Sequence, residues 1–566
     1  MASNLKAIRK ELKANKFSGI IIPKWDEFRS ENVAAADDYL AWSSGFKGSY
    51  GVAFVSPKQA ILFVDGRYTL QASYEAPEFE IISINDMKEW IITHATGEIV
   101  FDPWLWTEEE IQSFQTDRSD FFPLTDFFER PWPVDKRPKK ELMKITYYPL
   151  SGQSSFDKRM EVAKHIKPHD FLLLTSPDSV SWLLNIRDTE REFTPVVNAY
   201  ALVSSQGLVE LFVDGEYKDL FDGVMVFEKN VLIARLMGLK NSTVIISPKA
   251  SFIVKKALQN HVIGTNPIEM MKACKNEVEL QYIRLIHRRD GAALSEFLTW
   301  LEMTDEPLSE ISVRDSLLEF RKLQRHFMKP SFPSIVGAKE HSAIIHYQPT
   351  EESNYAIEDG DVLLIDSGGQ YWGGTTDVTR TLVIGSAKKS CHYFKELYTA
   401  VLKGLIAVSS CKFKRGTTGH QLDALARQFL WDKGLDYAHG TGHGVGAYLN
   451  VHEGPCALSP RVSHVPLKEG MVVSVEPGVY LDDEFGIRLE NLLCVIPIED
   501  HPEFLTFETL TYVPFCPELV LFEELTEKEQ AWLKNYHEET ILQNIYTLIS
   551  DDCYDWMFEI KEEFSK

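Results

Sequence analysis

Two segments of the sequence are near copies of each other, and this repeat constrains the fold more than any other feature. Residues 62–68 read Leu-Phe-Val-Asp-Gly-Arg-Tyr, and residues 211–217 read Leu-Phe-Val-Asp-Gly-Glu-Tyr. Each copy is preceded by a tryptophan and by an apolar strand pattern, at residues 51–55 and 199–203. Because matched strand–turn–strand patterns at a fixed interval indicate internal duplication, we expect two related α/β domains before the third and largest part of the chain.

The domain boundaries are predicted from composition and periodicity. Residues 131–138 contain three prolines, which resist regular structure and indicate a linker. From Asn276 onward, apolar residues recur at the spacing of a helix. We therefore expect domains at residues 1–145, 146–272 and 273–566, the last ending in amphipathic helices over about 520–566.

Charge and cysteine usage narrow the class of protein. The chain has 59 Lys and Arg against 83 Asp and Glu, a formal net charge of −24, which argues against binding to nucleic acid or to an anionic membrane. Its start is charged rather than apolar, and no apolar run approaches the ~18 residues of a membrane span. Seven cysteines without a C-x-x-C pair argue against a disulfide framework. We expect a cytoplasmic protein.

Four acidic residues occupy strand positions where apolar side chains are usual, and two of them lie on one predicted hairpin. Residues 362–384 read as two strands joined by a glycine-rich turn. Asp366 ends the first strand and Asp377 begins the second, although Asp is depleted in strands. Alternation places Asp366 on the same face as Leu364, so its carboxylate should point into an apolar interior.

The other two acids follow or occupy strands further along. Residues 471–475 form an apolar strand that leads into Glu476, and residues 485–493 carry Arg488 and Glu490 on one face. Burying four carboxylates together costs several kcal/mol per charge unless positive charge neutralises them. Arg380 and Arg488 are near in sequence and can serve one or two of the four, so a further source of positive charge is needed.

A glycine-rich loop supplies histidines in the same part of the chain. His439, His443 and His452 fall within fourteen positions, and His346 ends an apolar run upstream. The glycines do not indicate a dinucleotide loop, because no strand leads directly into them and no helical pattern follows. The sequence also contains no G-x-S-x-G elbow and no H-E-x-x-H zinc helix.

A metal centre accounts for this set of residues. Two Asp, two Glu and one neutral His carry a charge of −4, which two divalent ions balance. An oxygen-rich set with one imidazole suits Mn²⁺, with Zn²⁺, Co²⁺ and Fe²⁺ as alternatives that spacing does not distinguish. Two such ions bind a bridging water and lower its pKa, so the predicted reaction class is metal-assisted hydrolysis.

These residues resemble a known family. The order of the acids and His443 resembles the dinuclear metal set of the pita-bread metallopeptidases, which include methionine aminopeptidase, prolidase and aminopeptidase P. Residues 440–446, 449–455 and 476–480 are similar to phrases of the long, three-domain, cytosolic Xaa-Pro aminopeptidases. Residues 42–49 and 182–187 are similar to their first two domains. The resemblance implies two duplicated creatinase-like N-terminal α/β domains and a C-terminal pita-bread catalytic domain.

The resemblance also implies a role for each metal ligand. Asp377 and Glu490 would bridge both ions, and Asp366 would hold one of them. His443 and Glu476 would hold the other. Glu476 would in addition take a proton from the bridging water and pass it toward the leaving nitrogen.

Four further residues receive roles around the metals. By the resemblance, His452 would stabilise the developing oxyanion, His346 would lie beside the scissile amide, and His439 would serve as a relay or supporting residue. Arg488 lies two residues before Glu490, on the same predicted face, and we expect it to orient that carboxylate.

The implied activity is hydrolysis of the N-terminal Xaa-Pro bond of peptides with proline at the second position. The leaving proline nitrogen carries no hydrogen, so a pocket for the ring is needed, and Tyr347 and Tyr480 are candidates for it. The resemblance further implies a homodimer formed with the C-terminal helices. Two alternatives stay open: a prolidase that cleaves only Xaa-Pro dipeptides, and an inert binding module on the same fold. The second is disfavoured because all five ligand types are present.

Overall fold

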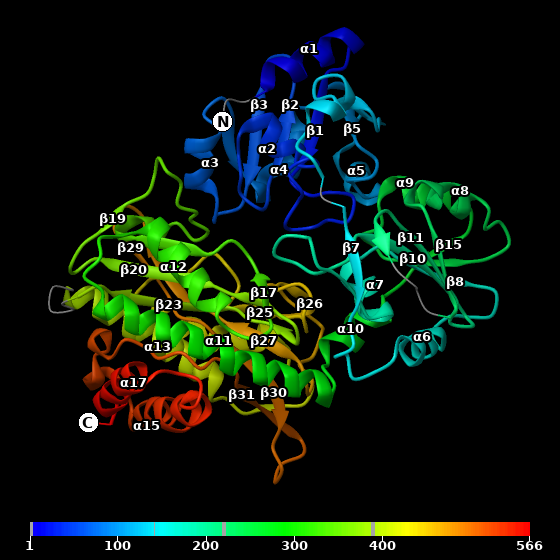
Figure 1. The fold of residues 1–566 in the computed structure, drawn as a ribbon. Helices are drawn as coiled ribbons and strands as arrows, with labels where there is room; N and C mark the ends of the chain where they lie inside the picture. Colours follow the sequence, from blue (N-terminus) through cyan, green and yellow to red (C-terminus); the bar gives the residue numbers. More distant parts are fainter. Residues whose placement is uncertain (1–3, 141, 218–221, 386–390, 566) are drawn as a thin grey trace. The chain divides into compact units, whose positions relative to one another are not determined.

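The structure, a computed structural model of the whole chain, describes residues 4–140, 142–217, 222–385 and 391–565. It divides into two compact units, each organised around its own sheets (Figure 1). The N-terminal unit consists of Met1–Tyr148, Gln153–Arg191 and Val196–Ile268. The C-terminal unit consists of Pro149–Gly152, Glu192–Pro195 and Glu269–Lys566.

The N-terminal unit contains two six-stranded sheets of the same topology. The strand order is β4-β3-β2-β1-β5-β6 in the first and β13-β11-β10-β8-β14-β15 in the second. In both sheets the third strand in this order runs antiparallel to its two neighbours, and the other three pairs of adjacent strands are parallel. The strands are β1 (Gly19–Pro23), β2 (Val52–Val55), β3 (Ala60–Val64), β4 (Glu80–Ser83), β5 (Gly97–Phe101), β6 (Ser119–Pro123), β8 (Phe171–Leu174), β10 (Ala199–Ser204), β11 (Val209–Val213), β13 (Val224–Phe227), β14 (Val244–Ile246) and β15 (His261–Ile263).

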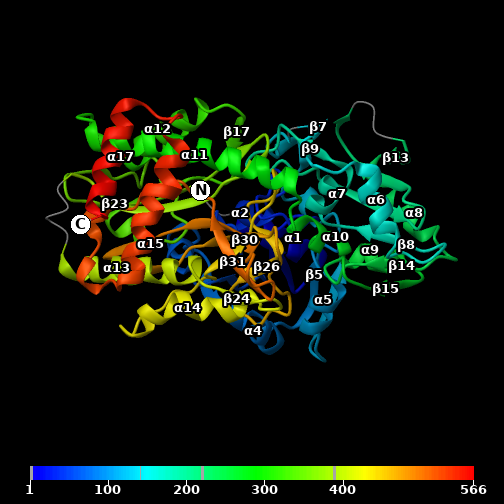
Figure 2. The ribbon, with the colours of Figure 1, turned by 90° about the horizontal axis from the view of Figure 1, so that it is seen from below.

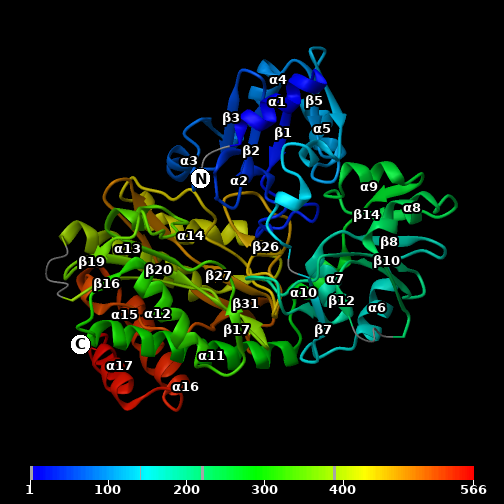
Figure 3. The same cartoon turned by 45° about the horizontal axis from the view of Figure 1, so that its top comes forward.

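The repeated sequence occupies equivalent positions in the two sheets. The Val-Asp-Gly turn follows β3 in the first sheet and β11 in the second. Both strands are buried along their whole length, and both are apolar except at Glu210 of β11, as expected for strands covered on two faces. In the first sheet α1 (Leu5–Asn15) packs on one face and α5 (Glu108–Phe114) on the other (Figure 3). The predicted duplication is therefore confirmed.

The C-terminal unit places a six-stranded sheet beside smaller ones. The large sheet has the order β24-β31-β30-β27-β25-β26, and a three-stranded sheet has the order β18-β20-β23. Helices α13 (His392–Ser409) and α14 (Gly419–Trp431) share one apolar core with β27 and β30. The strands are β18 (Ile335–Ala338), β20 (Val362–Ser367), β23 (Val378–Val383), β24 (Phe413–Lys414), β25 (Gly442–Gly444), β26 (Glu453–Leu458), β27 (Val472–Val475), β30 (Asn491–Pro497) and β31 (Phe504–Thr509).

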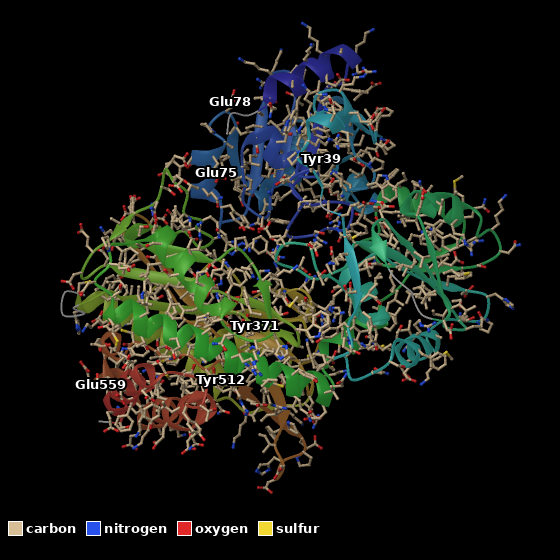
Figure 4. All side chains as sticks on the ribbon, viewed as in Figure 1. Tyr39, Glu75, Glu78, Tyr371, Tyr512 and Glu559 are labelled. Carbon is tan, nitrogen blue, oxygen red and sulfur yellow. The ribbon has the colours of Figure 1, made fainter. Side chains whose placement is uncertain are left out.

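The longest helix of this unit begins where the helical pattern was predicted. Helix α11 (Glu277–Met303) starts at a capping box in which Asn276 and Glu279 satisfy each other's backbone N–H groups. A Cβ atom at Gly291 would lie 2.6 Å from the carbonyl oxygen of Tyr512. Glycine therefore lets α11 pack directly against the backbone at Tyr512, which lies beside this helix (Figure 4).

The C-terminal helices pack within the same unit. Helix α15 (Glu527–Asn535) begins at the predicted capping box of Thr526 and Glu529. It lies beside α13, and α17 (Asp551–Glu563) lies beside α11 (Figure 2). The predicted α/β class, with helices on mixed sheets, is confirmed. No helix in the described parts of the chain is both long enough and apolar enough to cross a membrane.

Candidate metal centre

The hairpin of β20 and β23 brings the two aspartates to the same end. Asp366 is the fifth residue of β20, opposite Thr379 of β23, and Asp377 immediately precedes β23. The connection folds back on itself, because the backbone N–H of Gly369 donates a 2.9 Å hydrogen bond to the hydroxyl of Thr376. Both aspartates are at least nine-tenths buried.

The two glutamates come from adjacent strands of the large sheet. Val475 of β27 is paired with Asn491 of β30, so Glu476 and Glu490 lie next to each other at the end of this ladder. The backbone N–H of Glu490 donates to the carbonyl of Thr379 at 3.1 Å, and the Thr379 hydroxyl donates to Glu490 Oε2 at 2.9 Å. Thr379 thus connects the sheet to the aspartate hairpin, a role that sequence analysis did not find.

The prediction of one continuous strand over residues 485–493 is wrong. Residues 485–493 form two strands, β29 (Phe485–Arg488) and β30, which belong to different sheets. Strand β29 pairs with β28 (Gly478–Leu481), whereas the chain at Glu490 turns its backbone N–H toward Thr379. The break separates Arg488 from Glu490, which alternation along one strand had placed side by side.

Arg488 consequently contacts a different carboxylate from the one expected. Its Nη2 donates to Asp366 Oδ2 at 2.7 Å, its Nη1 to the Tyr480 hydroxyl at 2.8 Å, and its Nε to the Thr379 hydroxyl at 3.3 Å. No hydrogen bond among the described atoms joins Arg488 directly to the Glu490 carboxylate, and the two are connected only through the Thr379 hydroxyl. That Arg488 orients Glu490 stays a prediction, and the carboxylate that Arg488 holds directly is that of Asp366.

The second arginine near the site does not neutralise a carboxylate. Arg380 is buried, and its guanidinium donates to the main-chain carbonyls of Glu490 and Val513 and to the Tyr536 hydroxyl. It therefore links the hairpin to the C-terminal helices. Of the two arginines considered as counter-ions, only Arg488 forms an ion pair with a site carboxylate in the described structure.

His443 lies on β25 with one ring nitrogen directed at the carboxylates. Its Nδ1 is 3.0 Å from the carbonyl oxygen of Gly444, which can only accept, so Nδ1 carries the proton. The lone pair of Nε2 then faces Asp377 Oδ2 at 3.5 Å and Glu476 Oε1 at 3.6 Å. A backbone carbonyl that fixes the tautomer in this way is typical of histidines that ligate metals.

The predicted ligands form overlapping groups. In each group one possible ligand atom per residue lies within 4.8 Å of the others. The groups are Asp366, Asp377 and Glu490; His443, Glu476 and Glu490; and Asp377, His443 and His452. The structure thus brings together all five residues of the predicted metal set, and it adds His452 at their edge. That they bind metal stays a prediction.

The electrostatics of the group favour a bound cation. Burial raises the pKa of Asp366, an effect that Arg488 partly offsets, and burial together with Asp377 raises the pKa of Glu490 well above its usual range. Burial raises the pKa of Glu476 to about 7, with His443 acting in the opposite direction. Asp366 Oδ1 and Glu490 Oε1 are buried and accept no hydrogen bond from any described residue. Orphaned carboxylate oxygens that face other carboxylates fit metal ligands.

His439 belongs to a chain of hydrogen bonds behind the carboxylates. Its Nδ1 donates to the carbonyl of Gly440 at 2.8 Å, so its Nε2 accepts from the Tyr480 hydroxyl at 2.9 Å. Tyr480 in turn accepts from Arg488, which reaches Asp366. His439 therefore contacts the carboxylate group through two intermediate side chains.

His452 lies at the edge of the group, and His346 follows a residue that contacts Arg488. The ring of His452 is perpendicular to that of His443, with centroids 4.3 Å apart, and the His452 side chain is exposed. His346 is half-buried, and the carbonyl of the preceding residue, Ile345, accepts from Arg488 Nη2 at 3.3 Å. Of the two tyrosines suggested for a proline pocket, Tyr347 is buried and donates to Glu310 at 2.9 Å, which makes it a packing residue.

Comparison with known proteins identifies relatives along the whole chain. Residues 281–497 match the family model "Metallopeptidase family M24", and residues 503–562 match its C-terminal region. Residues 4–130 and 136–279 each match a creatinase/prolidase N-terminal domain. These matches and the duplicated sheets confirm the predicted fold class of two creatinase-like domains and a pita-bread domain.

Individual relatives are similar over nearly their full length. The probable Xaa-Pro aminopeptidase P of Metarhizium robertsii is 36% identical over 95% of each chain. The X-prolyl aminopeptidase of Caenorhabditis elegans, a cytosolic enzyme with a di-nuclear active site, superposes with a TM-score of 0.92 at 28% identity, covering 99% of this chain and 98% of that one. The prolidase of Pyrococcus horikoshii, at 24% identity and a TM-score of 0.51, covers 64% of this chain and 99% of its own, and supports the fold alone.

Proposed function

This chain belongs to metallopeptidase family M24, and we propose that it is an Xaa-Pro aminopeptidase. It would hydrolyse the bond between the first residue of a peptide and a proline at the second position. The observation that carries the proposal is the convergence of three buried carboxylates, the half-buried carboxylate of Glu476 and His443 Nε2. The chain also matches Xaa-Pro aminopeptidases over nearly its whole length.

We propose that the five residues hold two divalent ions. Glu490 belongs to both principal groups of ligand atoms, and Asp377 lies between Asp366 and His443. Asp377 and Glu490 would therefore contact both ions, Asp366 one ion, and His443 with Glu476 the other. When bound, such ions polarise a carbonyl oxygen and lower the pKa of water. The charge of −4 matches two divalent ions, and the mixed oxygen and imidazole set favours Mn²⁺.

The protein's own groups supply the proton transfers. Glu476 would accept a proton from the attacking water as its oxygen bonds to the carbonyl carbon, and would deliver that proton to the proline nitrogen as the C–N bond breaks. The proline nitrogen of the substrate is a tertiary amide, so it leaves as a secondary amine only after gaining this proton. One water is consumed, and the products are a free amino acid and a peptide that begins with proline.

Five further residues would act around this step. His452, next to His443 at the exposed edge, would donate to the oxygen that becomes negative in the tetrahedral state. His346 would lie beside the scissile amide. The bonded series of His439, Tyr480 and Arg488 would hold Asp366 in one orientation, because each member has a fixed partner.

We also propose a cytoplasmic homodimer with domains at residues 1–145, 146–272 and 273–566. All seven cysteines are free, as expected in a reducing compartment. The C-terminal helix α17 exposes two aromatic side chains, Tyr554 at 40% and Phe558 at 42%, which a second copy could cover. Sedimentation should give twice the mass of one 64.7 kDa chain; a monomer at micromolar concentration would exclude the dimer.

The decisive experiment combines metal analysis with two substrates. Purified protein should contain two divalent ions per chain and should cleave an Xaa-Pro-Xaa tripeptide after its first residue. A chelator should abolish activity, and Mn²⁺ should restore it best. Cleavage restricted to Xaa-Pro dipeptides would show that the enzyme is a prolidase instead. Equal restoration of activity by Mg²⁺ would indicate a metal site with oxygen ligands only.

A further inference from the structure

Three charged side chains are buried together beside the loop that carries His452. Glu453, the next residue, accepts a 2.8 Å hydrogen bond from Lys275 Nζ at Oε1. Lys272 Nζ lies 3.1 Å from Oε2, in an ion-pair contact that lacks hydrogen-bond geometry, and it donates to the carbonyl of Gly454 at 3.3 Å. The side chains of both lysines and of Glu453 are only 1% exposed.

Stability alone is a weak explanation for this cluster. Removing three charges from water is costly, and a buried ion pair is often no more stable than apolar residues of the same volume. Here two ammonium groups share one carboxylate. The attraction of each lysine to Glu453 is therefore partly offset by the repulsion between the two lysines. Buried ion pairs are better attested as devices that select one geometry.

The lysines are themselves attached to a strand of the site. The backbone N–H of Lys275 donates to the carbonyl of Gly470 at 3.0 Å. Gly470 has a φ of +78°, and a Cβ atom there would lie 2.5 Å from the carbonyl oxygen of Lys275. This contact fixes the lysine segment to the residues that lead into β27, the strand that ends before Glu476.

Glu453 in turn contacts both glycines that flank the loop's first turn. A Cβ atom at Gly446 would lie 3.0 Å from Glu453 Oε2, and one at Gly444 would lie 2.2 Å from the Glu453 carbonyl oxygen. Residues 446–450 form a turn that is closed by a 3.0 Å hydrogen bond from the N–H of Gly446 to the carbonyl of Asn450. Glu453 therefore packs against two glycines of the segment that joins His443 to His452.

We propose that Glu453, held by Lys272 and Lys275, is a positioning residue for His452. This inference rests on the proposed Xaa-Pro hydrolysis. The ion cluster connects the strand that leads to Glu476 with the loop that carries His452. It therefore keeps a fixed distance between Glu476, the proposed proton acceptor, and His452, the proposed donor to the oxyanion. A misplacement of about 1 Å in such a group costs on the order of 10²-fold in rate.

Glu453→Gln tests the proposal because the amide keeps the volume and removes the charge. We expect kcat to fall roughly 10–10²-fold while KM changes less than about threefold, since the affected interaction strengthens only in the transition state. Metal content should stay at two ions per chain. The control is Glu508→Gln, which removes the Arg284 ion pair on β31, away from the loop, and should leave kcat within twofold.

A double variant separates positioning from general support of the fold. In a His452→Ala background, Glu453→Gln should change kcat by less than about twofold, because its effect passes through the missing imidazole. Lys275→Met, which retains the Lys272–Glu453 contact, serves as a second variant whose folding is easier to preserve. It should show a smaller loss of kcat that also disappears without His452.

Several results would overturn the inference while leaving the function intact. One is a kcat near that of the wild type in folded Glu453→Gln and Lys275→Met. Another is a loss of kcat in the double variant equal to the product of the losses in Glu453→Gln and His452→Ala. A third is failure of both variants to fold, which would assign the cluster to stability. An inactive wild-type enzyme would instead overturn the proposed function.

Discussion

The carboxylates and His443 lie on or beside paired strands, whereas His452 belongs to the loop between β25 and β26, which has few ladder hydrogen bonds. Asp366 is fixed by its register opposite Thr379, and Glu490 by one backbone and one side-chain hydrogen bond to the same residue. The loop depends on close approaches of glycine and on side chains from elsewhere, such as Gln370, whose amide donates to the carbonyl of Leu449 at 2.8 Å. The difference suggests that the strands determine metal retention and that the loop determines turnover.

The largest effect is expected on the strand side. Asp377→Asn should abolish turnover, because a neutral amide between the two ion positions removes charge that both ions need. Hydrolysis of an Xaa-Pro-Xaa peptide and metal analysis check this. The matched control is Asp315→Asn on α12 (Glu310–Lys322), whose side chain is 60% exposed. More than a tenth of wild-type activity with two ions still bound would remove Asp377 from the site.

A smaller effect is expected on the loop side. His452→Ala should lower kcat on the order of 10²–10³-fold, the usual cost of one oxyanion donor. KM should move much less, because the interaction develops with the charge on the carbonyl oxygen. Steady-state kinetics measure both constants, and His392→Ala, at a side chain that is 71% exposed, is the control. A rise in KM with unchanged kcat would instead assign His452 to substrate binding.

The smallest effect should come from the hydrogen bonds behind the carboxylates. Tyr480→Phe keeps the ring but removes the contacts to His439 and Arg488. Because each of the two lost hydrogen bonds contributes about 1 kcal/mol net, kcat should fall roughly five- to thirtyfold with metal content unchanged. Tyr393→Phe, at a residue that is 45% exposed, is the control. A loss beyond about 10²-fold would give the Tyr480 hydroxyl a direct part in proton transfer.

Local patterns in the sequence predicted much of this architecture. The duplicated Val-Asp-Gly turns indicated two sheets of one topology, and the capping residues Asn276 and Thr526 marked where two helices begin. The aspartate hairpin followed from alternation and a glycine-rich turn. These features depend on residues close in the chain, where sequence spacing translates directly into geometry.

The contacts between distant segments were not predictable in the same way. Alternation assumed one strand through Arg488 and Glu490, and the break between them came from pairing with two different sheets. Thr379 was missed because its role depends on the register of three strands. The Lys275–Glu453 pair joins residues 178 positions apart, and no local pattern reports such a pair.

Metal counting in two histidine variants tests the account most directly. His443→Ala should retain one ion per chain, because the three carboxylates left without the imidazole form a weaker site for the second ion. His452→Ala should retain both ions and lose turnover. If His452→Ala loses an ion while His443→Ala keeps both, the assignment of the loop is reversed, and if both variants keep their metal and their activity, the account of a dinuclear hydrolase is contradicted.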